Sequence, residues 1–215
     1  MNVFNVCDAC GAYRVDKIID ESQDHAICPE CGHHHPFIRS ALAVVSGASG
    51  SGKTSVFRRM QATVTDFVVL EGDILWGPHF ESAATIFFET CLRVCKNVAQ
   101  AGRPVVLGGA GMGGPGNLES CVERRYFSTL HYVALTCDDA VLAERLCCRP
   151  TWRQCGNDKY VDEHVRFNRW FKERGSEASP PIDVIDTTTD SVEQTTTRVV
   201  RWVRGRLGLK DPNIL

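Results

Sequence analysis

From residue 41 onward, short apolar runs alternate with longer stretches in which apolar side chains recur every three or four residues. A short apolar run is typical of a buried strand, and the wider spacing is typical of a helix with one face on a core. The runs predict strands at 41–46, 67–73, 103–108, 132–136 and 182–186. The periodic stretches predict helices at 56–64, 82–101, 117–127, 138–148 and 190–207. This alternation predicts an α/β fold in three layers, with a parallel sheet between helices on both faces.

Polar residues mark where two of these helices begin. Asp138 stands directly before its helix, and Asp190-Ser-Val-Glu193 has the spacing of a capping box. In an open parallel sheet, ligands bind beyond the carboxyl ends of the strands. We therefore expect Asp73, the glycine-rich segment 108–116 and the region of Asp138 to lie along one rim, where a site would form.

The segment between the first strand and its helix is rich in glycine and ends in a lysine and two hydroxyl residues. Residues 47–55 match the phosphate-loop pattern Gly-x-x-x-x-Gly-Lys-Ser/Thr and stand in the strand–loop–helix context of a P-loop NTPase. Glycines let the backbone amides surround phosphates, and the helix N-terminus adds partial positive charge. Lys53 would reach the terminal phosphates of ATP, and Thr54 would hold Mg²⁺ through its hydroxyl. The predicted nucleotide-binding residues are Gly47, Ser49, Gly50, Ser51, Gly52, Lys53, Thr54 and Ser55.

Residues 1–38 lack the alternation and hold two Cys-x-x-Cys pairs, Cys7 with Cys10 and Cys28 with Cys31. A glycine follows each pair, so the backbone can curl and turn its amides toward the sulfur atoms. Two such pairs at this separation are typical of a closed, tetrahedral zinc site. We therefore predict a small zinc ribbon, in preference to free thiols or a redox pair. Its short strands are expected within 12–20 and 24–27.

Other histidines and cysteines are not expected to bind metal. His33, His34 and His35 follow the second pair, but four cysteines already fill a tetrahedral site, so we expect a solvated loop there. The remaining cysteines have no ligand spacing, and most are expected to be small core residues. These are Cys91, Cys95, Cys121, Cys137, Cys147, Cys148 and Cys155.

Composition excludes several classes of protein. The chain has 215 residues, with 24 lysines and arginines against 26 aspartates and glutamates, and its net charge is −2. Such a balance provides no general attraction for nucleic acid or an anionic membrane. No apolar run reaches the length of a signal-peptide core or of a membrane span. We therefore expect a cytoplasmic protein with reduced thiols and no membrane partner.

The order of the motifs resembles that of the P-loop small-molecule kinases. A strand that ends in Gly72-Asp73 follows the phosphate loop, and an arginine-rich helix–turn–helix at about 145–174 precedes the last strand. Gluconate, adenylylsulfate and shikimate kinases, chloramphenicol phosphotransferase and the nucleoside and nucleotide kinases share this plan, and the similarity covers residues 41–207. It implies a kinase domain over 39–210 in which 145–174 form a lid. Residues 180–188 resemble the segment that passes the adenine.

The resemblance also implies roles for individual side chains. Asp73 would accept the proton of the substrate hydroxyl or orient that hydroxyl, and Glu71 would help through metal-bound water. The alternative for Asp73 is a helix N-cap. The strand at 103–108 runs into Gly-Gly-Ala-Gly instead of an acidic pair, so Asp73 would also serve the metal. Arg149 and Arg153 would stabilise the transferred phosphoryl group, unless this basic stretch is a solvated helix.

Three aromatic residues after Asp73 admit two interpretations. Trp76, Phe80 and Phe87 would form a wall for a ring-shaped or drug-like substrate, or they belong to the core, where aromatic side chains at this spacing are more common.

The favoured function is an ATP-dependent phosphotransferase that moves the γ-phosphate to a hydroxyl or phosphate of a small molecule, with a nucleoside or nucleotide slightly preferred. Lys53, Asp73, Arg149 and Arg153 would be catalytic, with Mg²⁺ and a structural Zn²⁺ as cofactors. One alternative is a polynucleotide 5′-hydroxyl kinase that binds nucleic acid through the ribbon, although the acidic excess of the ribbon disfavours it. Another is a regulatory ATP-binding module. The sequence leaves open the oligomeric state, and whether the ribbon is a dimerisation arm or a cover over the active site.

Overall fold

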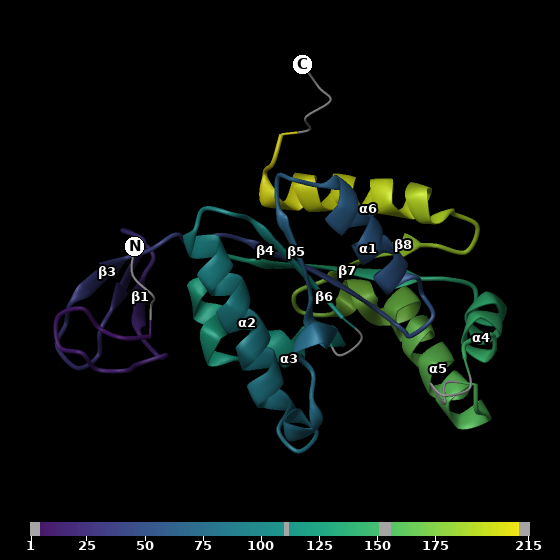
Figure 1. Cartoon of the computed structure of the whole chain (residues 1–215), viewed down its shortest axis with the longest axis horizontal. Helices are drawn as coiled ribbons and strands as arrows, with labels where there is room; N and C mark the ends of the chain where they lie inside the picture. The colour runs from purple at the N-terminus through teal and green to yellow at the C-terminus, as the bar shows by residue number, and fades with distance from the viewer. Residues whose placement is uncertain (1–4, 110–111, 151–155, 211–215) are drawn as a thin grey trace.

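The computed structural model describes residues 5–109, 112–150 and 156–210, and its larger part is a parallel sheet between helices (Figure 1). The strands are β4 (Leu42–Gly47), β5 (Val68–Glu71), β6 (Val105–Gly108), β7 (Leu130–Thr136) and β8 (Ile182–Asp186). Their order is β5-β6-β4-β7-β8, and each neighbouring pair is parallel. β4 is therefore central, which places the loop after it in the middle of the carboxyl edge of the sheet.

Helices cover both faces of this sheet, as predicted. α1 (Lys53–Thr63) and α6 (Val192–Leu207) lie on one face, and α2 (Ala84–Gln100) and α5 (Asp158–Arg174) lie on the other (Figure 1). Each face has its own apolar core, because alternate strand side chains point to opposite faces. The helical members of the two cores include Val56, Phe57, Met60, Val199 and Val203 on one side, and Phe87, Cys91, Leu92, Cys95 and Phe171 on the other. Among the described helices, none is both long and apolar enough to cross a bilayer.

The prediction of a single helix over 117–127 is wrong. The chain forms a short α3 (Gly116–Glu119), an extended residue at Cys121 and a 3-10 turn, η4 (Val122–Tyr126). The reason is a carboxylate from another element. Glu89 of α2 accepts hydrogen bonds from the backbone N–H groups of Val122 and Glu123 at 2.5 and 3.0 Å. A continuous helix would need those two amides for its own carbonyls.

Two predicted helix starts have different outcomes. Asp138 is confirmed as the N-cap of α4 (Asp139–Cys147), since its carboxylate accepts from the N–H groups of the first turn. The capping box of α6 is present but lies one residue later than predicted. Ser191 is the N-cap, and Gln194 returns the hydrogen bond to the Ser191 amide. Consecutive Asp190 and Ser191 can both cap a helix, so the pattern alone does not distinguish them.

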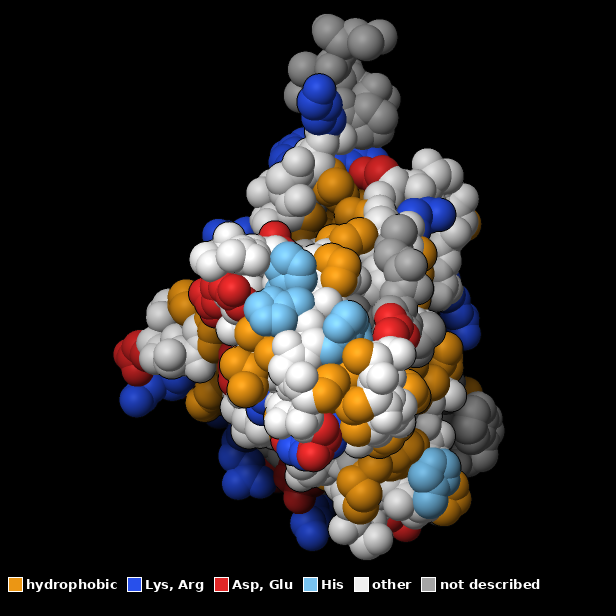
Figure 2. All heavy atoms as spheres, turned by 90° about the vertical axis from the view of Figure 1, so that its left-hand side faces the viewer, with side chains coloured by type: hydrophobic (Ala, Val, Ile, Leu, Met, Phe, Trp, Pro, Cys, Tyr) orange, Lys and Arg blue, Asp and Glu red, His pale blue; other side chains and the backbone are white. Residues whose placement is uncertain are grey.

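The amino-terminal segment forms a separate three-stranded antiparallel sheet. It consists of β1 (Ile18–Asp20), β2 (His25–Ile27) and β3 (His34–Pro36), in that order. The first two strands lie within the predicted ranges, but β3 falls where a solvated loop was expected. The expected loop is wrong for His34 and His35, which lie in the strand, and His35 pairs with Ala26 and is only 2% exposed. His33 and His34 are exposed, as expected. Figure 2 shows the outer face of this ribbon, where the other imidazole rings gather at the surface.

A tyrosine from the larger part of the molecule completes the core of the ribbon. Tyr126 of η4 is 1% exposed and packs with Ala26 and Phe37. Its hydroxyl donates to the carbonyl of Val15 at 2.7 Å and accepts from the amide of Lys17 at 3.3 Å. η4, which leads into β7, therefore supplies a buried side chain to the core of the ribbon, and this side chain forms hydrogen bonds with two backbone groups of the ribbon.

A buried ion pair stands at the same interface. The carboxylate of Glu123 is fully buried and accepts from Lys96 at 2.6 Å and from Arg93 at 2.8 Å. Burial lowers the pKa of Lys96, and the neighbouring Glu123 carboxylate opposes that shift. Lys96 also donates to Asn5 at 3.0 Å, and the Gln100 amide exchanges two 2.9 Å hydrogen bonds with the backbone of Ile38.

These contacts place the ribbon at the amino edge of the parallel sheet (Figure 1). The ribbon precedes β4 and contacts the end of α2 and η4, which lead into β6 and β7. The phosphate loop leaves β4 at the opposite edge. The ribbon is therefore not a cover over the phosphate loop of its own chain.

Replacing Glu123 with Gln tests the importance of this ion pair. The change leaves the ammonium of buried Lys96 without its anionic partner, so we expect the free energy of unfolding to fall by about 3 kcal/mol. Chemical denaturation measures this loss. Glu177→Gln is the matched control, because Glu177 pairs with Arg174 on the surface, where such pairs contribute little. Equal stability of the two variants would contradict the prediction.

Candidate active site

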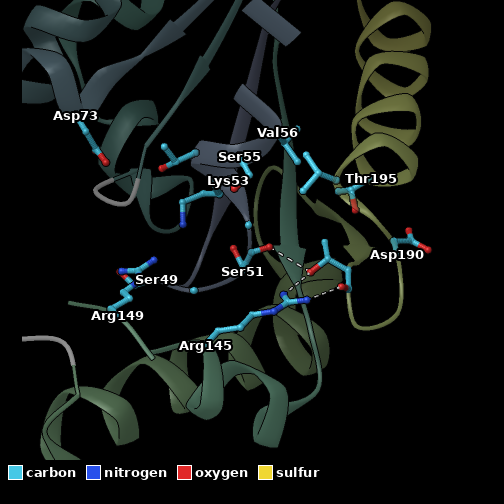
Figure 3. Close-up of a pocket in the computed structure, with 15 residues that line it drawn as sticks. Ser49, Ser51, Lys53, Ser55, Val56, Asp73, Arg145, Arg149, Asp190 and Thr195 are labelled. Carbon is cyan, nitrogen blue, oxygen red and sulfur yellow. Dashed lines mark hydrogen bonds between the residues drawn. The ribbon is translucent and has the colours of Figure 1, made fainter. Parts of the chain in front are cut away.

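The phosphate loop is shaped by three glycines with positive φ angles. Gly47, Gly50 and Gly52 have φ values of 141°, 89° and 98°. A Cβ atom on Gly47 would lie 2.4 Å from the carbonyl oxygen of Leu135 at the end of β7, so the loop packs directly on the neighbouring strand. The turn leads into α1, which begins at Lys53. This brings the predicted nucleotide-binding residues 49–55 together around one cavity of about 380 Å³ (Figure 3).

Lys53 lies inside this cavity and is nearly buried, with 8% of its surface exposed. Its ammonium donates to the carbonyls of Gly47 at 2.7 Å and Ala48 at 2.8 Å. Burial lowers the pKa of Lys53 to about 8, Asp73 opposes the shift, and Arg149 adds to it. Figure 3 shows the amine turned toward the side of the cavity on which Asp73 and Arg149 lie.

Two acidic residues reach the loop from β5 and the turn that follows it. The Thr54 hydroxyl donates to the carboxylate of Glu71 at 3.0 Å. Glu71 ends β5, and in the sheet it is level with Gly108 at the end of β6. Gly108 carries no side chain, and the ring of Phe57 fills the space that a Cβ atom there would need. The carboxylate beside Thr54 therefore comes from β5 and not from β6. The hydroxyl of Thr54 and the carboxylates of Glu71 and Asp73 are the hard oxygen donors that Mg²⁺ prefers, so this donor set fits the ion.

Asp73 lies in the 3-10 turn η1 (Gly72–Leu75), directly after β5. The N-cap position of this turn is Glu71, so Asp73 does not cap it. Its carboxylate lies so close to Gly109 that a Cβ atom there would come within 2.7 Å of Oδ1. The carboxylate thus lines the cavity on the side away from α6, beside the loop that follows β6.

The basic side chains between residues 145 and 174 divide into two groups. Arg145 and Arg149 line the cavity. Others form ion pairs away from it: Arg169 and Lys172 with Asp139, and Arg174 with Glu177. Arg153, which was also predicted to be catalytic, lies outside the described residues. The predicted arginine cluster therefore contributes two observed side chains to the cavity, and the rest of the described pairs tie α5 to its neighbours.

Thr187 also lines the cavity, and its contacts there were not predicted from the sequence. It follows β8, is 3% exposed, and its hydroxyl lies 3.1 Å from the Ser51 carbonyl and 3.0 Å from that of Thr136. The guanidinium of Arg145 donates to its carbonyl at 3.1 Å. Thr187 therefore joins the phosphate loop, the end of β7 and α4. It lies within the segment that was expected to pass the adenine.

The three aromatic residues after Asp73 belong mainly to the core. Phe80 is 7% exposed and Phe87 is fully buried, so for these two the core interpretation is confirmed. Trp76 packs edge-on against Phe87, with ring centres 5.0 Å apart, but keeps 47% of its surface exposed. Only this member of the predicted wall remains open to a ligand.

The four ribbon cysteines converge as predicted. Their Sγ atoms all lie within 4.8 Å of one another. The two turns are alike: Gly11 and Gly32 have φ values of 72° and 73°, and their amides donate to the carbonyls of Cys7 and Cys28. Four thiolates with no other donor in the group fit a tetrahedral zinc site. Cys91, Cys95, Cys121 and Cys137 are buried, as predicted for most of the remaining cysteines.

Comparison with solved structures shows the same fold in two bacterial kinases. A sugar kinase from a Janibacter species is 16% identical with a TM-score of 0.57, over 76% of this chain and 94% of its own. A gluconokinase from Sinorhizobium meliloti is 15% identical with a TM-score of 0.55, over 80% of this chain and 95% of its own. At these identities the likeness establishes the fold. No protein-family model matches the chain, and no curated protein matches its sequence.

If the cysteine cluster holds zinc, the purified protein contains about one zinc ion per chain. Cys28→Ser should lose the ion and lower the melting temperature by roughly 5–10 °C, because the ribbon core includes Tyr126 of the larger part. Metal analysis and thermal unfolding measure both effects. Cys148→Ser is the control, since Cys148 is exposed and outside the cluster. Metal retained in Cys28→Ser would contradict the assignment.

Proposed function

We propose that the protein is an ATP-dependent phosphotransferase that moves the γ-phosphate to a hydroxyl group of a small molecule. The observation that carries this proposal is the position of Asp73 in the same cavity as Lys53 and the phosphate loop. A phosphate loop alone supports nucleotide binding. A carboxylate beyond the terminal phosphates supplies what the second substrate needs, a group that receives or orients its hydroxyl.

The donor side of the site is built from the loop and the elements beside it. The amides of residues 49–55 and the ammonium of Lys53 would bind the β- and γ-phosphates. Thr54 and Glu71 would hold Mg²⁺, which when bound neutralises charge on the phosphate oxygens. Arg145 and Thr187 lie at the other end of the cavity, where the nucleoside would extend.

The transfer itself forms a bond between the acceptor oxygen and the γ-phosphorus and breaks the bond to the β-phosphate oxygen, so ADP leaves. Asp73 accepts the hydroxyl proton or holds the hydroxyl in line for attack. Negative charge spreads over the γ-oxygens during this step. Lys53 and Arg149, which lie on the same side of the cavity as Asp73 (Figure 3), stabilise this charge. We retain Arg153 as a further candidate for this role.

The acceptor in this proposal is a nucleoside or nucleotide. The resemblance that the sequence shows to nucleoside and nucleotide kinases supports a nucleoside or nucleotide, and the exposed face of Trp76 offers a surface on which a ring could stack. A polynucleotide acceptor is less well supported. Among the described side chains of the ribbon face in Figure 2, no continuous basic surface stands out, and the ribbon lies at the far edge from the loop.

Replacing Asp73 with Asn tests the assignment of the substrate carboxylate. Loss of the proton acceptor should lower kcat by about 10²- to 10⁴-fold, with little change in the dissociation constant of ATP. ADP release over a panel of hydroxylated acceptors and ATP-binding calorimetry measure the two quantities. Asp162→Asn on the exposed face of α5 is the control and should retain the wild-type rate. An equal loss of ATP affinity in Asp73→Asn would instead indicate a role in nucleotide binding.

Replacing Glu71 with Gln tests the proposed metal site. The Mg²⁺ concentration for half-maximal rate should rise about 10- to 100-fold, because Glu71 orients the Thr54 hydroxyl and supplies negative charge. The rate at saturating Mg²⁺ should recover more than in Lys53→Ala, which should abolish transfer. An unchanged Mg²⁺ dependence would remove Glu71 from the site.

A further inference from the structure

Two side chains of α5 contact the phosphate loop at a single residue, Ser49. The backbone N–H of Ser49 donates to Nδ1 of His164 at 3.3 Å. The hydroxyl of Tyr160 donates to the Ser49 hydroxyl at 3.0 Å. Tyr160 and His164 are one helical turn apart, and their ring centres are 4.3 Å from each other. Ser49 is 9% exposed, so these contacts are largely shielded from water.

The rest of α5 holds these two side chains in place. Asn168 is fully buried and exchanges hydrogen bonds with the backbone of Cys137, directly after β7, at 2.8 and 3.2 Å. Arg169 and Lys172 bind the carboxylate of Asp139 at the start of α4. Because α5 is anchored at its middle and far end, its first turns are presented to the loop on a rigid support.

We propose that His164 and Tyr160 are positioning residues that fix the conformation of the phosphate loop through Ser49. This inference rests on the proposed function only for its consequence in catalysis. The two contacts join the loop that would bind the phosphates to α5, which is tied through Asp139 to α4, the helix that Arg149 follows. The conformation of the phosphate loop and the positions of α4 and α5 are therefore fixed together, with the cation of Arg149 beside the cavity.

The hydrogen bond from Ser49 requires one particular protonation state of His164. Nδ1 can accept only when the ring is neutral and its proton is on Nε2. The charged groups that act on the ring are Lys53 of α1, Arg149 after α4 and Glu163 of α5 itself. Burial first, and then Lys53 and Arg149, lower the pKa of His164 from its ordinary 6.5, and Glu163 opposes them. The neutral ring that makes this contact is therefore favoured at neutral pH, and the contact is lost only as the pH falls through the lowered pKa of His164.

The experiment compares His164→Ala, His164→Asn and Tyr160→Phe with the full-length wild type. The first readout is the dissociation constant of Mg²⁺-free ADP between pH 5.5 and 8. Removal of one hydrogen bond in His164→Ala should weaken binding about three- to tenfold at pH 7.5. His164→Asn keeps an acceptor at the position of Nδ1 and should restore most of the affinity without titrating. Tyr160→Phe should cause a smaller loss.

Variation with pH separates a positioning role from simple packing. Wild-type affinity should decrease toward pH 5.5 more steeply than that of His164→Asn, since the titration of ADP itself is common to both. His131→Asn is the matched control, because burial also lowers the pKa of His131, which lies at the opposite end of β7. This control should retain the wild-type profile.

The second readout is the imidazole of His164 in the unliganded protein, followed by ¹⁵N NMR. The Nε2–H tautomer and a depressed pKa are expected, and Ser49→Pro, which removes the amide donor, should change the tautomer population. An Nδ1–H tautomer in the wild type, or equal loss of ADP affinity in His164→Ala and His164→Asn, would overturn the inference. If the protein shows no phosphoryl transfer but the tautomer and its response are as described, the proposed function fails and the positioning role stands.

Discussion

The close packing of the phosphate loop on the end of β7 is the constraint on which the site depends. The carbonyl of Leu135 leaves no room for a side chain at Gly47, so the loop turns directly off the central strand. The other components approach this turn from several elements. Glu71 ends β5 and Asp73 lies in η1, Arg145 is on α4 and Arg149 follows it, and Thr187 follows β8. Because the sheet fixes the position of this turn, the turn is a rigid reference around which the other side chains are arranged.

Charged side chains gather at both the carboxyl and the amino edge of the parallel sheet, but in different surroundings. At the carboxyl edge, cations and carboxylates line an open cavity, where they can exchange partners with a ligand. At the amino edge, Glu123 and Lys96 form a buried ion pair, and the partly exposed Arg93 binds the same carboxylate. Breaking the buried Glu123–Lys96 pair would leave a charge without its partner inside the protein, so this pair holds one arrangement. The charged groups around the cavity border an open space and can contact a ligand there.

The sequence was most informative where a feature depends on neighbouring residues. Strands at 41–46 and 132–136, the phosphate loop and the cysteine pairs were predicted from short segments, because apolar runs and fixed spacings determine them locally. Features that depend on distant residues were missed. Glu89 interrupts the helix predicted at 117–127, β2 buries His35, and α5 brings His164 to Ser49. Nothing near Ser49 in the sequence indicates a partner more than a hundred positions away.

The shared core of the ribbon also limits how far the ribbon can act as an independent module. Small metal-binding units are often regarded as modules that recombine freely between proteins. Here the hydroxyl of Tyr126 completes the hydrogen bonding of Val15 and Lys17, and Gln100 does the same for Ile38. Removal of the ribbon alone would take these partners away from the Tyr126 hydroxyl and the Gln100 amide, both of which belong to buried residues. The ribbon, the end of α2 and η4 therefore form one structural unit, and a ribbon grafted onto another protein would need equivalents of Tyr126 and Gln100.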